Sequence, residues 1–187
     1  MTTAEQWLQG ARPKTLYAAI APVLVGTAFA GYNASLLHFL LALSVSLSLQ
    51  IGVNYANDYS DGIKGTDNDR LGPIRLVASG LAKPNTVRSA AFLSFALAAI
   101  SGLLLSYRTS WVLIPIGLIS IAAAWGYTAG SKPYGYMGFG EVSVFIFFGV
   151  IATNGTYYVQ VEEFSSQVLL ASFALGALSC AILVLNN

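Results

Sequence analysis

The sequence predicts an all-α protein, a polytopic bundle of transmembrane helices, from its composition and from the spacing of its apolar runs. Of its 187 residues, 56% are hydrophobic and only 9% are charged, and the mean hydropathy is +0.66. A soluble core of this size cannot bury so much apolar surface, so part of it is expected to face lipid. Six uncharged runs approach the length of about 20 residues that a membrane-crossing helix needs.

These runs predict spans at residues 15–31, 34–53, 86–106, 109–127, 141–160 and 167–185. The first run also has features of a cleaved signal peptide, because Arg12 and Lys14 precede it and Ala28-Phe29-Ala30 resembles a cleavage site. Pro22 within the run and the later spans favour a retained helix instead.

The basic residues predict the orientation of the chain in the membrane. All of them except Arg108 lie in the N-terminal segment, in or beside the polar loop 54–85, or in the polar loop 128–140. By the positive-inside rule these segments face the cytoplasm, and Glu162 with Glu163 lies outside. The net charge of +1 gives no reason to expect a nucleic-acid partner.

The first polar loop suggests a metal site. If the second helix continues past residue 53, Asn54, Asp58 and Asp61 share one helix face at spacings of four and three. Two carboxylates so close repel each other unless a cation lies between them. Mg²⁺ suits the site because it is usually held by one or two carboxylates together with waters and substrate phosphate oxygens. The alternative is that these aspartates only cap the helix and solvate the loop.

Arginines in the same loop favour an anionic ligand. Arg70 and Arg75 lie beyond the aspartates, and guanidinium groups pair with phosphate oxygens in a bidentate geometry. Carboxylates and arginines together suit a diphosphate bridged by Mg²⁺. At the N-terminus, Arg12 and Lys14 either anchor the chain at the membrane surface or contact the same anionic substrate.

The second polar loop combines aromatic residues with a cation. Tyr127, Tyr134 and Tyr136 surround Lys132 in a glycine-rich stretch. Tyrosines at a membrane surface are often interfacial anchors. In a functional interpretation their rings stabilise an allylic carbocation as diphosphate leaves, while Lys132 contacts the diphosphate or an acidic acceptor.

Taken together, these stretches resemble the UbiA-type intramembrane prenyltransferases, whose members carry an N-D-x-x-D segment after the second helix. Asn57-Asp58-Tyr59-Ser60-Asp61 matches that segment. The continuation Gly62-Ile63-Lys64-Gly65-Thr66-Asp67, the stretch Arg70-Leu71-Gly72-Pro73-Ile74-Arg75 and the opening Arg12-Pro13-Lys14-Thr15 resemble the menaquinone branch. The resemblance covers essentially the whole chain.

The resemblance implies transfer of a polyprenyl group from polyprenyl diphosphate to 1,4-dihydroxy-2-naphthoate, with loss of carbon dioxide to give demethylmenaquinone, at a multi-pass site in the cell membrane. Mg²⁺ is the implied cofactor, and membrane lipid surrounds the protein. The loops and the resemblance together predict the site residues. The expected catalytic residues are Asp58, Asp61, Lys132 and Tyr134, and the expected metal ligands are Asp58, Asp61 and Asp67. The expected substrate-binding residues are Arg12, Lys14, Asn54, Asn57, Arg70, Arg75, Tyr127 and Tyr136.

The chain departs from the family pattern in two ways. Many members have a third aspartate where this chain has Gly65, so Asp67 is expected to act as the outer ligand. Residues 1–187 are expected to form a single transmembrane prenyltransferase domain that is incomplete at its C-terminus. Six spans of about 20 residues are fewer than the family's roughly nine, and a second aspartate-rich segment is expected beyond Asn187.

Two competing functions remain from the sequence. One keeps the chemistry but uses another aromatic acceptor such as 4-hydroxybenzoate. The other is a cation channel or transporter in which Asp58 and Asp61 line an ion path, as intramembrane carboxylates often do. The second is disfavoured because both aspartates lie beside a basic loop at the membrane surface.

Overall fold

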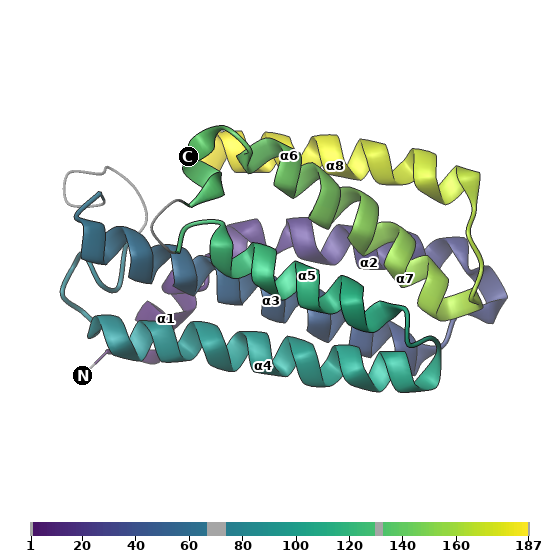
Figure 1. The fold of residues 1–187 in the computed structure, drawn as a ribbon, viewed down its shortest axis with the longest axis horizontal. Coiled ribbons are helices and arrows are strands. Elements are labelled where there is room, and N and C mark those ends of the chain that lie inside the picture. The colour runs from purple at the N-terminus through teal and green to yellow at the C-terminus, as the bar shows by residue number, and fades with distance from the viewer. Residues whose placement is uncertain (1, 67–73, 130–132, 187) are drawn as a thin grey trace.

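A computed structural model describes residues 2–66, 74–129 and 133–186, and in this part of the chain every regular element is helical (Figure 1). The α-helices are α1 (Ala4–Gly10), α2 (Tyr17–Phe29), α3 (Leu36–Lys64), α4 (Pro84–Arg108), α5 (Leu113–Gly126), α6 (Gly140–Val144), α7 (Ala152–Val161) and α8 (Ser166–Asn186). Short 3₁₀ turns occur at Pro13–Thr15, Gly31–Asn33 and Tyr134–Met137, and a π-helical segment, Phe145–Ile151, joins α6 to α7. The prediction of an all-α bundle is confirmed.

Each predicted span corresponds to an apolar helix, but the helices differ in length. Within the described residues, four are long and apolar enough to cross a membrane: α3, α4, the continuous helix Gly140–Val161, and α8 over Ser166–Leu185. The helices α2 and α5 are shorter. The first begins only at Tyr17 because a separate 3₁₀ turn precedes it, and the second begins at Leu113 after a turn. The chain is therefore a multi-pass membrane protein, and of the six predicted spans four correspond, within the described residues, to helices long enough to cross a membrane and two to shorter apolar helices.

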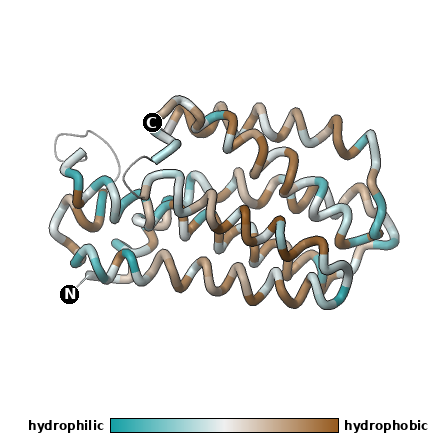
Figure 2. Tube along the Cα trace, in the orientation of Figure 1, coloured by the Kyte–Doolittle hydropathy of each residue, from teal (hydrophilic) through white to brown (hydrophobic). Residues whose placement is uncertain are grey.

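The surface of the bundle suits a lipid environment. The long helices lie roughly along the longest axis, and Figure 2 shows apolar residues along the middle of the bundle with polar residues gathered near its two ends. Large apolar side chains such as Leu93, Leu118 and Leu170 are 73%, 64% and 67% exposed. In water this surface would be unfavourable, whereas in a bilayer it faces hydrocarbon.

Small residues let the helices approach closely, as is usual in membranes. A Cβ on Gly26 of α2 would stand 2.6 Å from the Thr153 carbonyl oxygen of α7, and one on Gly149 would stand 2.5 Å from the Gly176 Cα of α8. The Phe95 ring of α4 packs directly against the Cα of Gly52 on α3. These contacts join α2 to α7, the π-helical segment to α8, and α3 to α4.

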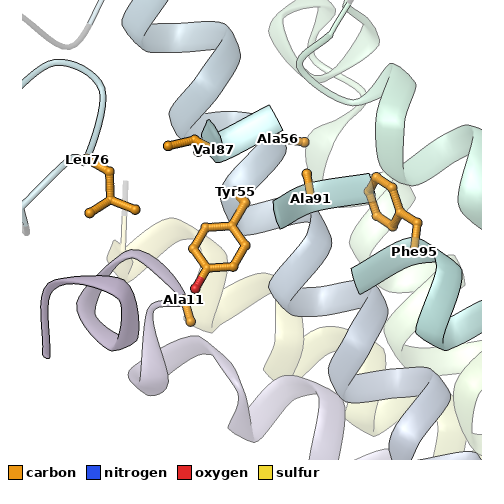
Figure 3. Packing of buried hydrophobic residues seen from close by; sticks show 7 residues of the cluster. All are labelled: Ala11, Tyr55, Ala56, Leu76, Val87, Ala91 and Phe95. Carbon is orange, nitrogen blue, oxygen red and sulfur yellow. The ribbon is translucent and has the colours of Figure 1, made fainter. Parts of the chain in front are cut away.

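A hydrophobic cluster at one end of the bundle joins the N-terminal segment to α3 and α4. Its buried members, shown in Figure 3, are Ala11, Tyr55, Ala56, Leu76, Val87, Ala91 and Phe95. The Tyr55 hydroxyl donates a hydrogen bond of 2.9 Å to the Trp7 carbonyl, which attaches α1 to α3. The cluster thus gives this end of the bundle a packed core.

The α3–α4 contact gives the first prediction. Gly52→Ala should lower the melting temperature, because the added methyl group overlaps the Phe95 ring and overpacking costs about 1–3 kcal/mol. Gly102→Ala on α4 is the matched control, since its Cβ would lie 3.9 Å from Val45 Cγ2, an ordinary contact. Thermal unfolding of both variants in detergent measures the difference. Equal melting temperatures would contradict the packing described here.

Candidate active site

The helix of the second predicted span continues past residue 53, as the sequence analysis required for its metal site. Helix α3 runs to Lys64 and ends at Gly65, whose φ of 75° terminates the helix in the left-handed region. Asn54, Asp58 and Asp61 therefore lie on one helix and are 2%, 1% and 8% exposed. Two carboxylates this deeply buried require hydrogen bonds or a cation to remain charged.

Asp58 holds the segment that follows the first polar loop. Its Oδ2 accepts the backbone N–H of Leu76 at 2.8 Å, and its Oδ1 accepts that of Val77 at 2.9 Å. Leu76 is fully buried, and Val77 packs directly against the Cα of Gly62 on α3. The aspartate thus fastens a distant stretch of backbone to α3.

Asp61 and Asn57 contact the second polar loop. The Tyr136 hydroxyl donates a hydrogen bond to Asp61 Oδ1. The Thr128 hydroxyl donates to Asn57 Oδ1 at 2.5 Å, and Lys64 Nζ donates to the Thr128 carbonyl at 3.1 Å. The two loops that were singled out separately in the sequence therefore meet at the end of α3.

An elongated cavity of about 270 Å³ begins beside these contacts and extends between the helices. At this end it is lined by polar side chains that include Arg12, Asn54, Asn57, Tyr127 and Tyr134. Farther along, its walls are mainly apolar and include Val23, Ala42, Leu105 and Val159. The cavity therefore suits an amphiphile with one polar end.

A buried hydrogen-bond network shapes the polar end of the cavity. Asn54 Nδ2 donates to the Ala11 carbonyl at 2.8 Å and to Thr15 Oγ1 at 3.1 Å. Gln50 Nε2 donates to Thr15 Oγ1 and to Asn54 Oδ1, both at 3.2 Å. The network supports the turn at Arg12, whose φ of 53° is in the left-handed region.

The sequence analysis missed Gln50 and Thr15 as parts of this site. The available signal was the position of Gln50, a polar residue within an apolar run and four residues before Asn54, which places both amides on one helix face. Thr15 entered the sequence analysis only as the last residue of the Arg12-Pro13-Lys14-Thr15 stretch, without a role of its own.

Tyr127 and Tyr134 form an aromatic pair at the same end. Their rings meet edge to face with centroids 5.5 Å apart, and the Tyr134 hydroxyl donates to the Ala123 carbonyl at 2.8 Å. Burial raises the pKa of Tyr127 above its usual value, as do Tyr134 and Glu141, against the opposing effect of Arg12. Burial also raises the pKa of Tyr134, against the effect of its hydrogen bond with Ser143. Both phenols are therefore neutral hydrogen-bonding groups near neutral pH.

The remaining predicted site residues lie in different surroundings. Arg75 is 8% exposed, directly before the segment that Asp58 holds, whereas Tyr136 is 54% exposed. Lys14 is exposed and does not line the cavity. Asp67, Arg70 and Lys132 lie outside the described residues.

The donor set is compatible with Mg²⁺. Across the described ranges, no three or more His, Cys, Asp or Glu side chains gather into a metal-binding group. Asp58 and Asp61 nevertheless supply two carboxylates one turn apart on α3, and Mg²⁺ commonly uses only one or two protein carboxylates. Each carboxylate oxygen has more than one acceptor site, so the hydrogen bonds at Asp58 leave acceptor capacity for a cation.

These features define a helical membrane protein whose cavity has mainly apolar walls and a polar end beside paired carboxylates. The chain belongs to the UbiA prenyltransferase family, whose model matches residues 19–187. It is 54% identical over 189 residues to a 1,4-dihydroxy-2-naphthoate octaprenyltransferase of Mycobacterium tuberculosis. It is 38% identical over 199 residues to the protein of that name in Escherichia coli, and 30% identical over 195 residues to a 2-carboxy-1,4-naphthoquinone phytyltransferase of Synechocystis.

The matches cover the chain almost completely, at 100%, 100% and 99% of its length in the same order. They cover 65%, 64% and 61% of the respective relatives. The chain therefore spans a little under two thirds of the length of these proteins.

The role of Asp58 gives the second prediction. In nanodisc-reconstituted protein, Asp58→Asn should speed tryptic cleavage after Arg75 at least about tenfold, because losing a buried charged acceptor costs about 1–3 kcal/mol. Asp61→Asn is the control, since its carboxylate bonds to Tyr136 and not to the 76–77 backbone. Mass spectrometry of the released peptides gives the rates. Identical digestion of the two variants would show that Asp58 does not hold this segment.

Proposed function

We propose that the whole protein transfers a polyprenyl group from polyprenyl diphosphate to 1,4-dihydroxy-2-naphthoate, giving the quinol form of demethylmenaquinone. Two of the relatives described above carry the name of this octaprenyl transfer, and a third is named for phytyl transfer to a related naphthoquinone. They share a naphthalene-derived acceptor and differ in the tail, which supports the naphthoate as the common substrate.

The shape and polarity of the cavity carry the proposal. Its polar end, with Arg12, Asn54, Asn57, Tyr127 and Tyr134, suits a charged head group and an aromatic acceptor, and its apolar walls suit an isoprenoid tail. A polyprenyl diphosphate combines these two parts in one molecule. Because the tail lies among apolar side chains, its reactive end is held beside the polar groups.

Asp58 and Asp61 are the proposed Mg²⁺ ligands, and Asp67 is proposed as a third. Bound Mg²⁺ would act as a Lewis acid on the diphosphate leaving group. Arg75 is proposed to pair with diphosphate oxygens, because a guanidinium matches their geometry. Arg70, Lys132 and Lys14 are proposed to add positive charge around the same group.

The reaction exchanges one bond to the prenyl carbon for another. The bond between the allylic carbon and the diphosphate oxygen breaks, and the pair of electrons leaves with diphosphate. The naphthoate ring carbon that carries the carboxylate bonds to the allylic carbon, and the carboxylate departs as carbon dioxide, which restores the aromatic ring. No external oxidant or reductant is needed.

Side chains at the cavity's polar end would assist this exchange. The rings of Tyr127 and Tyr134 offer electron-rich faces to positive charge on the allylic carbon. Their neutral hydroxyls, with the Asn57 amide, offer hydrogen bonds to the acceptor's oxygens. The apolar walls limit access of water, which would otherwise capture the allylic carbon.

The polar end is proposed to face the cytoplasm of a cell membrane. Arg12, Lys64 and Arg75 lie in segments that meet at this end, whereas Arg108 is the last residue of α4 at the other end of that helix. This distribution follows the positive-inside rule. Water-soluble 1,4-dihydroxy-2-naphthoate would then reach the site from the cytoplasm.

The competing functions have less support. Among the residues that the structure describes, no Asp or Glu lines the cavity, so an ion crossing the bundle would meet a long apolar stretch without a counter-charge. The three relatives described above are named for naphthalene-derived acceptors rather than for 4-hydroxybenzoate. Membrane assays with either acceptor test the choice between them.

The metal assignment gives the third prediction. In the full-length enzyme, Asp61→Asn should lower kcat/KM by about two orders of magnitude. The loss of a charged ligand weakens Mg²⁺ binding, and Mg²⁺ stabilises the charge on the leaving group by several kcal/mol. The rate of diphosphate release from membranes at saturating Mg²⁺ is the measurement. Glu163→Gln, at an exposed position far from the polar end, is the control. Near-normal turnover of Asp61→Asn would refute its role as a ligand.

The proposed role of Arg75 gives the fourth prediction. Arg75→Ala should raise the KM for polyprenyl diphosphate at least about tenfold while leaving the KM for the naphthoate little changed, because hydrogen bonds to charged groups contribute about 1.5–3 kcal/mol. Arg75→Lys retains the charge but not the planar guanidinium that can form two parallel hydrogen bonds, so its KM for polyprenyl diphosphate should be intermediate. Equal increases of both KM values would reject a specific contact with the diphosphate.

A further inference from the structure

Two of the helices that line the cavity do so with residues at helical spacing. On α5 the lining residues include Leu113, Gly117, Ser120 and Ala124, which are three or four residues apart. Residues at these spacings lie on one helix face. Gly117 is therefore in the middle of the face that α5 turns toward the cavity.

The second of these walls comes from the helix Gly140–Val161. Its lining residues include Phe148, Ile151, Gly155 and Val159, again three or four positions apart. Gly155 occupies the same central position on this face as Gly117 does on α5. Each wall therefore has a glycine among larger apolar side chains.

Helix packing does not explain these two glycines. A Cβ on Gly26 or Gly149 would lie only 2.6 or 2.5 Å from a neighbouring helix, so those positions need glycine for close contact. A Cβ on Gly117 or Gly155 would meet no atom within 4 Å. Glycine destabilises a helix interior relative to alanine, and at these two positions it is not needed for close packing between helices. Because neither residue has a side chain, the volume beside it in the cavity stays open.

Both glycines lie at a similar depth. Gly117 precedes Tyr127, the residue directly after α5, by ten residues, and Gly155 follows Ser143 by twelve residues on the other helix. With a rise of about 1.5 Å per residue, each lies roughly 15–18 Å from the polar end. A short isoprenoid occupies the cavity before this level, whereas a longer tail must extend past the two glycines.

We propose that Gly117 and Gly155 determine which tail lengths the cavity accepts, by keeping open the section that longer isoprenoid tails must enter. The inference rests on the proposed function, because it takes the ligand to be a prenyl diphosphate. Larger side chains at either position would fill that section and leave the polar end unchanged. The two glycines are thus specificity-determining residues that do not touch the reacting atoms.

The test measures binding of four probes to the chain in nanodiscs: inorganic diphosphate and the geranyl, farnesyl and geranylgeranyl diphosphates. Gly117→Leu and Gly155→Leu should raise the Kd for geranylgeranyl diphosphate at least about tenfold, since an overfilled apolar site strongly disfavours the larger ligand. Geranyl diphosphate and inorganic diphosphate should bind as they do to the unchanged chain. Leucine is a better helix former than glycine, so both variants should fold.

Leu118→Phe is the matched control, because it enlarges a neighbouring side chain that is 64% exposed on the outer surface of α5. It should leave all four Kd values unchanged. Graded variants, Gly155→Ala and Gly155→Val, should give intermediate effects that grow with side-chain volume.

The outcomes separate this inference from the function on which it rests. If the unchanged chain binds no prenyl diphosphate more tightly than inorganic diphosphate, the proposed function fails and the inference fails with it. If the unchanged chain binds prenyl diphosphates but the leucine variants retain their preference for long tails, only the inference is overturned. A uniform loss for all four probes would also overturn it, because it would show damage to the polar end.

Discussion

The polar end of the bundle depends on one interaction: the Asp58 carboxylate accepts hydrogen bonds from the backbone N–H groups of Leu76 and Val77. A carboxylate that is 1% exposed is stable as an anion only when it is hydrogen-bonded. The two N–H groups meet that need and are themselves satisfied in return. Leu76 then fills the space beside Gly10 and Tyr55, which fixes the N-terminal segment against α3. Arg75, one residue earlier, is placed at the same end by the same contact.

This contact changes how the aspartate pair should be understood. The sequence analysis treated a metal site and a helix-capping role as alternatives. In the structure, Asp58 instead binds backbone N–H groups that are remote in sequence, and its oxygens keep acceptor capacity for a cation. A cation at Asp58 and Asp61 would draw on the same oxygens that hold the Arg75 segment and Tyr136. Under the proposed function, metal binding and the position of Arg75 would be coupled through Asp58, because the carboxylate that would hold the metal also holds the Arg75 segment. Substitution of Asp58 would then affect fold and chemistry together, so Asp61 is the cleaner probe of the proposed metal site.

The sequence predicted the helices well because hydropathy alone identifies segments that lipid can surround. The shared face of Asn54, Asp58 and Asp61 was inferred on the condition that the second helix continues past residue 53, and α3 meets that condition because it runs to Lys64. The sequence did not predict the short α1, the π-helical segment Phe145–Ile151 or the reduced length of α2 and α5. These features depend on contacts between segments, such as Phe145 against Gly176. The contacts of Thr128 with Asn57 and of Tyr136 with Asp61 join residues 71 and 75 positions apart, and local patterns carry no signal for such distant pairs.

The bundle divides recognition of an amphiphile between two kinds of environment. At the polar end, buried amides and hydroxyls are largely committed to one another through Gln50, Asn54 and Thr15, so a ligand there must replace or extend a defined set of hydrogen bonds. A mismatch leaves a polar group unsatisfied, which is costly in a site of low dielectric constant. Along the apolar walls, dispersion contacts grow with the length of the tail and have little directional preference. For the proposed prenyl diphosphate, the head group would therefore select the chemistry, and the tail would contribute affinity only as far as the walls leave room for it.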